Sequence, residues 1–234
     1  MFNGKMKAIT FSYDDGVTQD IRLIELFNKY GMKGTFNINS GLLGRPGSLV
    51  RDGVQINHTK NREDEVRQIY AGHEIAVHSV SHPNLNNIAD PNEIIREVEE
   101  DRIRLTELAG YDVIGMAYPC TGGDDRVADI LRRHTKVRYS RSTHSTYSFD
   151  LQENLMQFNP TVYHHKEMDK MFELGRQFLA LEADRPQIFY IWGHAYEFDI
   201  FNDWGRMEEF CAMMAGRDDI FYGTNSEILL APHN

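Results

Sequence analysis

Two adjacent carboxylates, Asp14 and Asp15, directly follow a short apolar segment near the start of the sequence. Successive side chains of a strand point to opposite sides, so one carboxylate can face a metal ion while the other faces an attacking water molecule. The same residues with Gly16 also fit an ordinary turn, because Asp-Asp-Gly is common turn chemistry. The triplet alone therefore favours a turn, and a catalytic interpretation needs further ligands from elsewhere.

Two histidines four positions apart, His78 and His82, are candidates for those ligands in the segment HSVSHP. The spacing favours both imidazoles on one side of a helical turn, from which they can bind one cation. Alone, the pair also fits the exit of a strand that Pro83 ends. With one carboxylate, two histidines leave coordination positions open for water and a substrate oxygen, which is typical of a catalytic metal site.

Two more polar positions, Cys120 after Pro119 and His194, follow later apolar segments. Each group, like the Asp pair and the His pair, lies at or just after the expected end of a strand. In parallel βα architectures the catalytic loops gather at that face of the sheet. Four separate segments are therefore expected to bring polar groups to one rim.

Apolar β-rich segments alternate with amphipathic helical segments along the chain, which predicts βα units around a parallel sheet or barrel. Strands are expected over residues 7–13, 34–38, 74–78, 113–118, 136–140, 187–192 and 219–222, and helices over 20–30, 62–70, 91–109, 126–134, 167–181 and 207–215. This makes about seven units in one α/β domain that covers residues 1–234. Residues 40–59 are interpreted as a long loop, and residues 143–165 have no clear pattern beyond an extra strand near 156–162.

The composition excludes some classes of function. A net charge of -10 disfavours nucleic acids and acidic membrane surfaces as partners. Cys120 and Cys211 have no recognised spacing, so neither a disulfide framework nor a cysteine zinc site is expected. The sequence shows no secretion signal and no apolar segment of about 18 residues, so we expect a cytoplasmic protein with no membrane partner.

The order of the motifs resembles the polysaccharide deacetylase family, which is carbohydrate esterase family four. The resemblance rests on TFSYDDG, on HSVSHPNL, on a Pro-containing strand end and on a late apolar strand ending in His194. It extends roughly from Ile9 to His194, and its first two motifs are specific in combination. It implies a distorted (β/α)7 barrel-like sheet. The implied activity is metal-dependent removal of N- or O-linked acetyl groups from carbohydrate of the chitooligosaccharide, peptidoglycan or xylan type.

The resemblance also implies roles for the motif residues. Asp14 matches the general base, and the metal ligands would be Asp15, His78 and His82. Zinc suits this ligand set best, although cobalt, nickel, iron or manganese would also fit.

His194 matches the general acid, and Ile191 or Trp192 would form an apolar wall around the acetyl methyl group. The backbone N–H of Cys120 would hold the oxyanion, a role that needs no particular side chain.

The sequence departs from the family pattern in three places. The Arg that usually orients the base is missing near Ala117, and Arg141 is a candidate substitute. The Asp-Trp motif is missing from RSTHSTYSFD. Ala195 follows the late His where Asp is common, so Glu197 or Asp199 is expected to orient His194 instead.

The leading function is a deacetylase that acts on acetylated carbohydrate, and the sequence does not indicate its oligomeric state. Two other functions stay open. One is a metal-dependent amide hydrolase for a small non-carbohydrate substrate, which the missing motifs favour. The other is a catalytically silent sugar-binding relative, against which the presence of Asp14 and His194 speaks. Four histidines are interpreted as solvated, namely His58, His73, His134 and His233, and three in the unclear segment could line a substrate groove, namely His144, His164 and His165.

Overall fold

The computed structural model describes residues 2–232 and contains a curled, mostly parallel sheet. Its strands are β1 (Lys7–Asp14), β2 (Gly34–Ile38), β5 (Glu74–Val77), β6 (Gly115–Ala117), β7 (Tyr139–Arg141), β8 (Val162–Tyr163), β9 (Gln187–Gly193) and β10 (Ile220–Tyr222). They are paired in the order β7-β6-β5-β2-β1-β9-β8, while β10 is parallel to the first half of β1. The predicted α/β barrel-like architecture in a single domain is confirmed.

The two edges of the sheet are linked by the segment after a 3-10 turn, η4 (Leu155–Gln157). The Phe158 N–H donates to Ser140 O of β7 at 2.9 Å, and the Thr161 N–H donates to Tyr190 O of β9 at 2.8 Å. The sheet therefore curls far enough for one short segment to reach both edges. The extra strand expected near residues 156–162 exists only as the two residues of β8.

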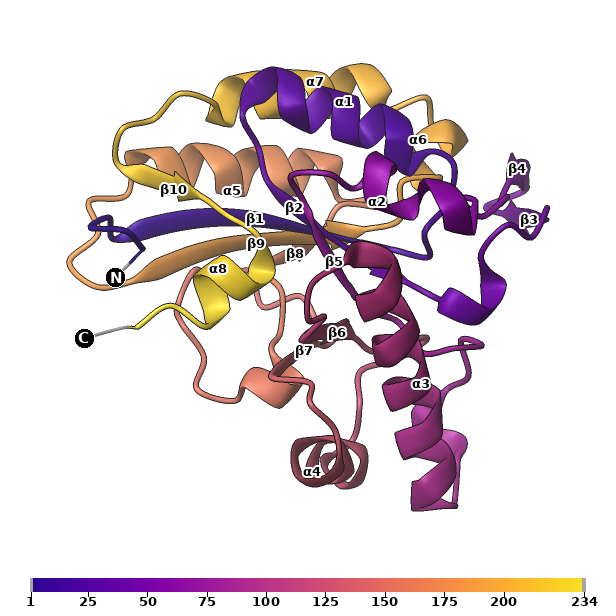
Figure 1. The fold of residues 1–234 in the computed structure, drawn as a ribbon. Coiled ribbons are helices and arrows are strands. Elements are labelled where there is room, and N and C mark those ends of the chain that lie inside the picture. The colour runs from indigo at the N-terminus through magenta and orange to yellow at the C-terminus, as the bar shows by residue number, and fades with distance from the viewer. Residues whose placement is uncertain (1, 233–234) are drawn as a thin grey trace.

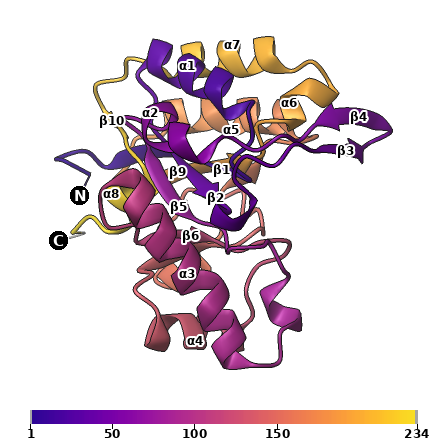
Figure 2. The ribbon, with the colours of Figure 1, turned by 45° about the vertical axis from the view of Figure 1, so that its right-hand side comes forward.

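Helices cover the outside of the sheet, as Figures 1 and 2 show, with α1, α5 and α7 grouped on one side and α3 and α4 on the other. They are α1 (Asp20–Tyr30), α2 (Val66–Ile69), α3 (Pro91–Ala109), α4 (Asp125–His134), α5 (Met168–Ala180), α6 (Glu197–Ile200), α7 (Trp204–Met214) and α8 (Asn225–Leu229). The ends of α3 follow the sequence signals. The Asp90 side chain caps its first turn, Pro91 occupies the first position, and Gly110 ends it at φ +81°.

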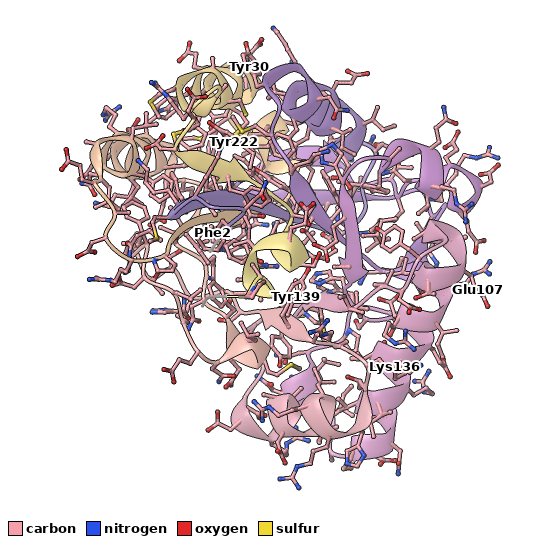
Figure 3. All side chains as sticks on the ribbon, turned by 60° about the vertical axis from the view of Figure 1, so that its left-hand side comes forward. Phe2, Tyr30, Glu107, Lys136, Tyr139 and Tyr222 are labelled. Carbon is pink, nitrogen blue, oxygen red and sulfur yellow. The ribbon has the colours of Figure 1, made fainter. Side chains whose placement is uncertain are left out.

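Helix α8 closes the barrel at the N-terminal ends of the strands. The Glu74 carboxylate, which is buried at the start of β5, accepts hydrogen bonds from the Tyr139 hydroxyl at 2.9 Å and from the Ser226 N–H of α8 at 2.9 Å. Figure 3 shows Phe2 and Tyr139 on either side of this helix. The opposite end of the barrel, where the strands end, is therefore the end left open for a site.

The segment predicted to be a long loop contains regular secondary structure, so that prediction was wrong. It contains the 3-10 turn η1 (Ser40–Leu42) and an antiparallel hairpin of β3 (Ser48–Arg51) and β4 (Val54–Asn57). Asp52 and Gly53 form the two-residue connection with φ of 52° and 79°, the conformation that Asp-Gly favours in tight hairpins. The hairpin extends from the barrel in Figures 1 and 2.

Some shorter elements also differ from the expectation. The helix expected over residues 62–70 is a 3-10 turn, η2 (Glu63–Glu65), followed by the single turn α2, and η3 (Leu85–Asn87) and α6 were not expected. Within residues 2–232, no helix combines the length and the apolar character needed to cross a bilayer.

Candidate active site

All six candidate residues line one cleft of about 630 Å³ at the C-terminal ends of the strands. They are Asp14, Asp15, His78, His82, Cys120 and His194. The prediction that separate segments would meet at one rim is therefore confirmed geometrically. The cleft also receives Leu49 and Arg51 from the β3–β4 hairpin, part of a segment that we expected to border the site as a loop.

Asp15, His78 and His82 each offer one ligand atom within 4.8 Å of the others. The Asp15 Oδ1 atom lies 3.6 Å from His82 Nε2. The His78 Nδ1 atom is 2.8 Å from the carbonyl oxygen of Ala117, which leaves Nε2 free to face the cleft. Burial, as the largest cause, lowers the pKa of His78 from 6.5 to about 4, so the ring is neutral near pH 7, as a metal ligand must be.

The two histidines converge through a tight turn and not through the expected helical turn. β5 ends at Val77, and Ser79 and His82 then adopt positive φ of 64° and 62°. The Ser79 hydroxyl accepts a hydrogen bond from the His82 N–H at 3.1 Å. This turn brings the rings to a centroid distance of 4.9 Å.

Asp15 is held in place by His58 at its carboxylate and by Lys60 at its backbone oxygen. The His58 Nε2 atom lies 3.1 Å from Asp15 Oδ2, and Lys60 donates to the Asp15 backbone oxygen at 2.7 Å. Burial opposes ionisation, but the His58 hydrogen bond and the Lys60 charge keep the pKa of Asp15 well below 3.8. The interpretation of His58 as a solvated residue was wrong. The Asp-Gly turn was a signal for the hairpin, but no local pattern links His58 to Asp15.

Asp14 is buried beside the ligand set and is held on both oxygens. Asn37 donates to Asp14 Oδ1 at 2.8 Å, and the Arg141 guanidinium donates to Oδ2. Arg141 is fully buried at the end of β7, with its guanidinium carbon 4.2 Å from the centroid of the Trp192 ring. The guanidinium of Arg141, from β7, therefore lies beside Asp14. This is the residue that the sequence offered as a substitute for the missing Arg.

His194 lies after β9 and contacts Glu197, one of the two carboxylates that the sequence suggested. The His194 Nδ1 atom is 3.0 Å from Glu197 Oε1, while its backbone N–H donates to Oε2 at 2.9 Å. Burial works against a charged ring, but Glu197, and then Asp15 and Asp14, raise the pKa of His194 above 6.5. The other candidate, Asp199, accepts a hydrogen bond from the Trp204 indole.

Cys120 follows β6 and has a positive φ of 64°. Its Sγ atom is 3.8 Å from His82 Nδ1. Within residues 2–232, the Cys120 N–H donates to no protein acceptor, and Cys120 lines the cleft.

The remaining histidines differ in their surroundings. His73 is 7% exposed, so its interpretation as solvated was wrong, whereas His134 is exposed. His164 is buried between Tyr13 and Phe198. His144 and His165 line a hollow beside the cleft, and His233 lies outside the described residues.

The donors fit a divalent cation. One ionised carboxylate and two imidazoles, buried or half-buried and within reach of one another, form the set expected of a catalytic metal site with open positions. Asp15 stays ionised and His78 stays neutral near pH 7, so no proton has to leave either ligand before a cation binds.

Several solved structures share the fold. A protein from Mycobacterium smegmatis assigned to the polysaccharide deacetylases aligns with a TM-score of 0.70 at 18% identity, over 97% of this chain and 90% of that one. The allantoinase Puue gives 0.69 at 12% identity over 95% and 88%. A family 4 acetyl xylan esterase from Clostridium thermocellum, solved with a cobalt ion, gives 0.59 at 15% identity over 96% and 91%.

In two other matches, this chain covers a smaller share of the matched protein. This chain spans 61% of a deacetylase from Streptococcus pyogenes and 44% of a polysaccharide deacetylase from Bacillus cereus. No curated protein matches the chain. The family model for polysaccharide deacetylase matches residues 3–138, more than half of the chain, and this segment supplies the Asp pair, the His pair and Cys120. The chain therefore belongs to the polysaccharide deacetylase family.

Proposed function

We propose that this protein is a metal-dependent hydrolase that removes acetyl groups from carbohydrate. The observation that carries the proposal is the arrangement of Asp14 beside the Asp15, His78 and His82 ligand set, with His194 in the same cleft. A base, a metal site and an acid together are what hydrolysis of an acetyl amide or ester requires. Family membership supports the same chemistry.

Asp15, His78 and His82 would hold the cation. Zinc suits these donors best, although cobalt, nickel, iron and manganese also suit them. When bound, the cation would polarise the acetyl carbonyl and make water in the cleft more acidic.

The side chains of the protein would carry the proton transfers. Asp14, fixed by Asn37 and Arg141, takes a proton from the attacking water. The Cys120 N–H holds the oxyanion of the tetrahedral adduct, and removing one such donor costs about 3 to 4 kcal/mol in other enzymes. His194 donates a proton to the leaving nitrogen or oxygen, and Glu197 holds the ring in place from its other nitrogen.

A second candidate function is hydrolysis of an amide in a small non-carbohydrate substrate. The structural reason is the hairpin, whose Arg51 reaches Tyr163 and Tyr196 at one wall of the cleft. A hairpin fixed to the cleft wall in this way would suit a small substrate better than a long polymer.

Acetate release with and without a chelator tests the proposal. The substrates are acetylated chitooligosaccharides, acetylated xylan and acetylated peptidoglycan fragments, with a small acyl amide as the alternative. We expect chelator-sensitive acetate release from at least one carbohydrate. Turnover of the small amide alone would favour the second function, and metal binding without any turnover would favour a silent relative.

Two variants separate the proposed roles. Asp14→Asn should lose turnover and keep its metal content, because Asp14 is placed beside the ligand set and not in it. His78→Ala should lose both. Metal analysis of the purified proteins together with acetate release gives the comparison, and equal metal loss in the two variants would contradict the assignment.

A further inference from the structure

Arg51, at the end of β3, makes three polar contacts across one wall of the cleft. Its Nη1 atom is 2.8 Å from Glu197 Oε1 and 2.9 Å from the Tyr196 hydroxyl, and its Nη2 donates to the Tyr163 hydroxyl at 2.6 Å. These partners come from α6, from the turn before it and from β8. One guanidinium therefore joins the hairpin to three parts of the cleft wall.

The most important of these partners is Glu197, because its side chain has no exposed surface. A buried carboxylate needs compensating charge and hydrogen bonds to remain ionised. Burial favours its protonated form, but His194, followed by His164 and Arg51, lowers the pKa of Glu197 to about 2. Among residues 2–232, Arg51 is the one lysine or arginine side chain in an ion pair with Glu197.

The same carboxylate holds His194. Glu197 Oε1 contacts Arg51, the Tyr163 hydroxyl and the His194 ring, while Oε2 accepts from the His194 backbone. Oε2 also lies 3.3 Å from His164 Nε2. Without Arg51, we expect the carboxylate to shift toward the donors that remain. The His194 ring would then lose the partner that fixes its orientation.

We propose that Arg51 is a positioning residue, which fixes the Glu197 carboxylate and thereby keeps the His194 ring oriented for proton donation into the cleft. The inference rests on the proposed function, in which His194 is the general acid. It gives the hairpin a part in catalysis although none of its residues is placed on the reacting atoms.

The chemistry of the leaving group distinguishes this role from general support of the fold. When the tetrahedral adduct collapses, the carbon–nitrogen or carbon–oxygen bond to the sugar breaks, acetate forms, and the sugar atom takes the proton from His194. A sugar amine or alkoxide leaves poorly without that proton. A 4-nitrophenolate leaves readily as an anion, so hydrolysis of 4-nitrophenyl acetate needs the base and the metal site but little help from the acid.

The test compares Arg51→Met and Arg51→Lys with the wild type on the best acetylated sugar and on 4-nitrophenyl acetate. Arg62→Met is the matched control, because the Arg62 side chain is 67% exposed and, within residues 2–232, forms ion pairs only with Asp64 and Glu65. Metal content and the thermal midpoint are measured for every variant. We expect Arg51→Met to lose about 10- to 100-fold in kcat on the sugar, the range found for residues that orient a functional ligand, while KM, metal content and ester hydrolysis stay near wild type.

Arg51→Lys should recover part of the loss, since it restores the charge but not the contacts with both tyrosines. An equal loss on both substrates, or no loss on the sugar, would overturn the inference. If Arg51→Met is too unstable to purify, the selective loss must appear in Arg51→Lys, and its absence there overturns the inference.

Failure of the proposed function gives a different pattern. A wild-type protein that cleaves 4-nitrophenyl acetate but no acetylated carbohydrate contradicts the carbohydrate assignment. Alkyl acetates, which have a poor leaving group, then replace the acetylated sugar. A loss in Arg51→Met on alkyl acetates but not on 4-nitrophenyl acetate would still support the role of Arg51. A wild-type protein that cleaves none of these substrates with metal bound contradicts both.

Discussion

The ion pair of Asp14 and Arg141 shows how a single buried charge depends on its partner. Both side chains are almost completely buried, at 3% and 0% exposure. Breaking such a pair leaves one charge uncompensated, whereas removing both charges costs much less.

We expect Arg141→Met to lower the free energy of unfolding by about 3 to 5 kcal/mol, because Asp14 stays buried without its cation. The double variant Asp14→Asn with Arg141→Met should recover part of that loss. Urea unfolding gives both values, with the exposed Arg138→Met as control. A double variant no more stable than Arg141→Met would show that the side chain of Arg141 matters through packing and not through charge.

Residue types and spacing were enough to find the residues that come together in the cleft. An Asp pair and a His pair at strand ends are local patterns, and so is a His after an apolar strand. Arg51 and His58 could not be found in this way. Their roles depend on contacts with Glu197 and Asp15, carboxylates that are far from them along the chain. Sequence periodicity reports which side chains are buried, but it does not report which distant charges meet.

At the scale of elements, α1 and α2 are joined through a buried carboxyl group. Asp20, the first residue of α1, accepts a hydrogen bond from the Tyr70 hydroxyl just after α2 at 2.7 Å. Its Oδ1 atom has no hydrogen-bond partner within residues 2–232. Burial raises the pKa of Asp20 from 3.8 to about 8, so the folded protein holds this proton near pH 7.

The raised pKa of Asp20 predicts a pH dependence of stability that Asp20→Asn should remove. The folded state binds this proton more tightly than the unfolded state. The stabilisation is therefore complete below the unfolded pKa of 3.8 and is lost as the pH rises through about 8. Relative to the variant, the wild type should lose stability between these values with a slope of up to about 1.4 kcal/mol per pH unit.

Urea unfolding of the wild type and Asp20→Asn in the presence of chelator, at several pH values, measures this difference. The variant keeps an acceptor for the Tyr70 hydroxyl, so the local hydrogen bond is retained. Parallel stability curves for the two proteins would contradict the raised pKa.

The elements themselves were predictable where the sequence marks their ends. Helix α3 has a capping Asp90, Pro91 at its first position and Gly110 at its end, and its bounds match the prediction. The hairpin was missed because its short strands are mostly exposed and only the cross-strand pair of Leu49 and Ile56 packs inward, although Asp52-Gly53 is a hairpin signal. Single-turn helices such as α6 have too few residues to show a periodic pattern.

For the whole molecule, the proposed metal ligands connect distant parts of the barrel. Asp15 follows β1, while His78 and His82 follow β5, and β2 lies between these strands in the sheet. A cation bound by these residues would bind the folded state and not the dispersed ligands of the unfolded chain.

We expect added zinc to raise the thermal midpoint in a concentration-dependent way. At a free concentration of about 100 times Kd, the stabilisation is about 2.7 kcal/mol. Thermal unfolding of the wild type, His82→Ala and the exposed control His134→Ala gives the comparison. The wild type and His134→Ala should respond alike, and an undiminished response of His82→Ala would place the cation elsewhere.

The position of α8 has a consequence for synthesis on the ribosome. Ser226 supplies a donor to Glu74 across 152 positions of the sequence, and Asn225 contacts the Tyr190 hydroxyl inside the barrel. While the chain is still emerging, Glu74 lacks that donor, and the barrel end that α8 later covers is exposed to solvent. The nascent polypeptide therefore completes this end of its interior only after α8 has left the exit tunnel, so a chain stalled before that point would expose the buried Glu74 to the cell's chaperones and proteases.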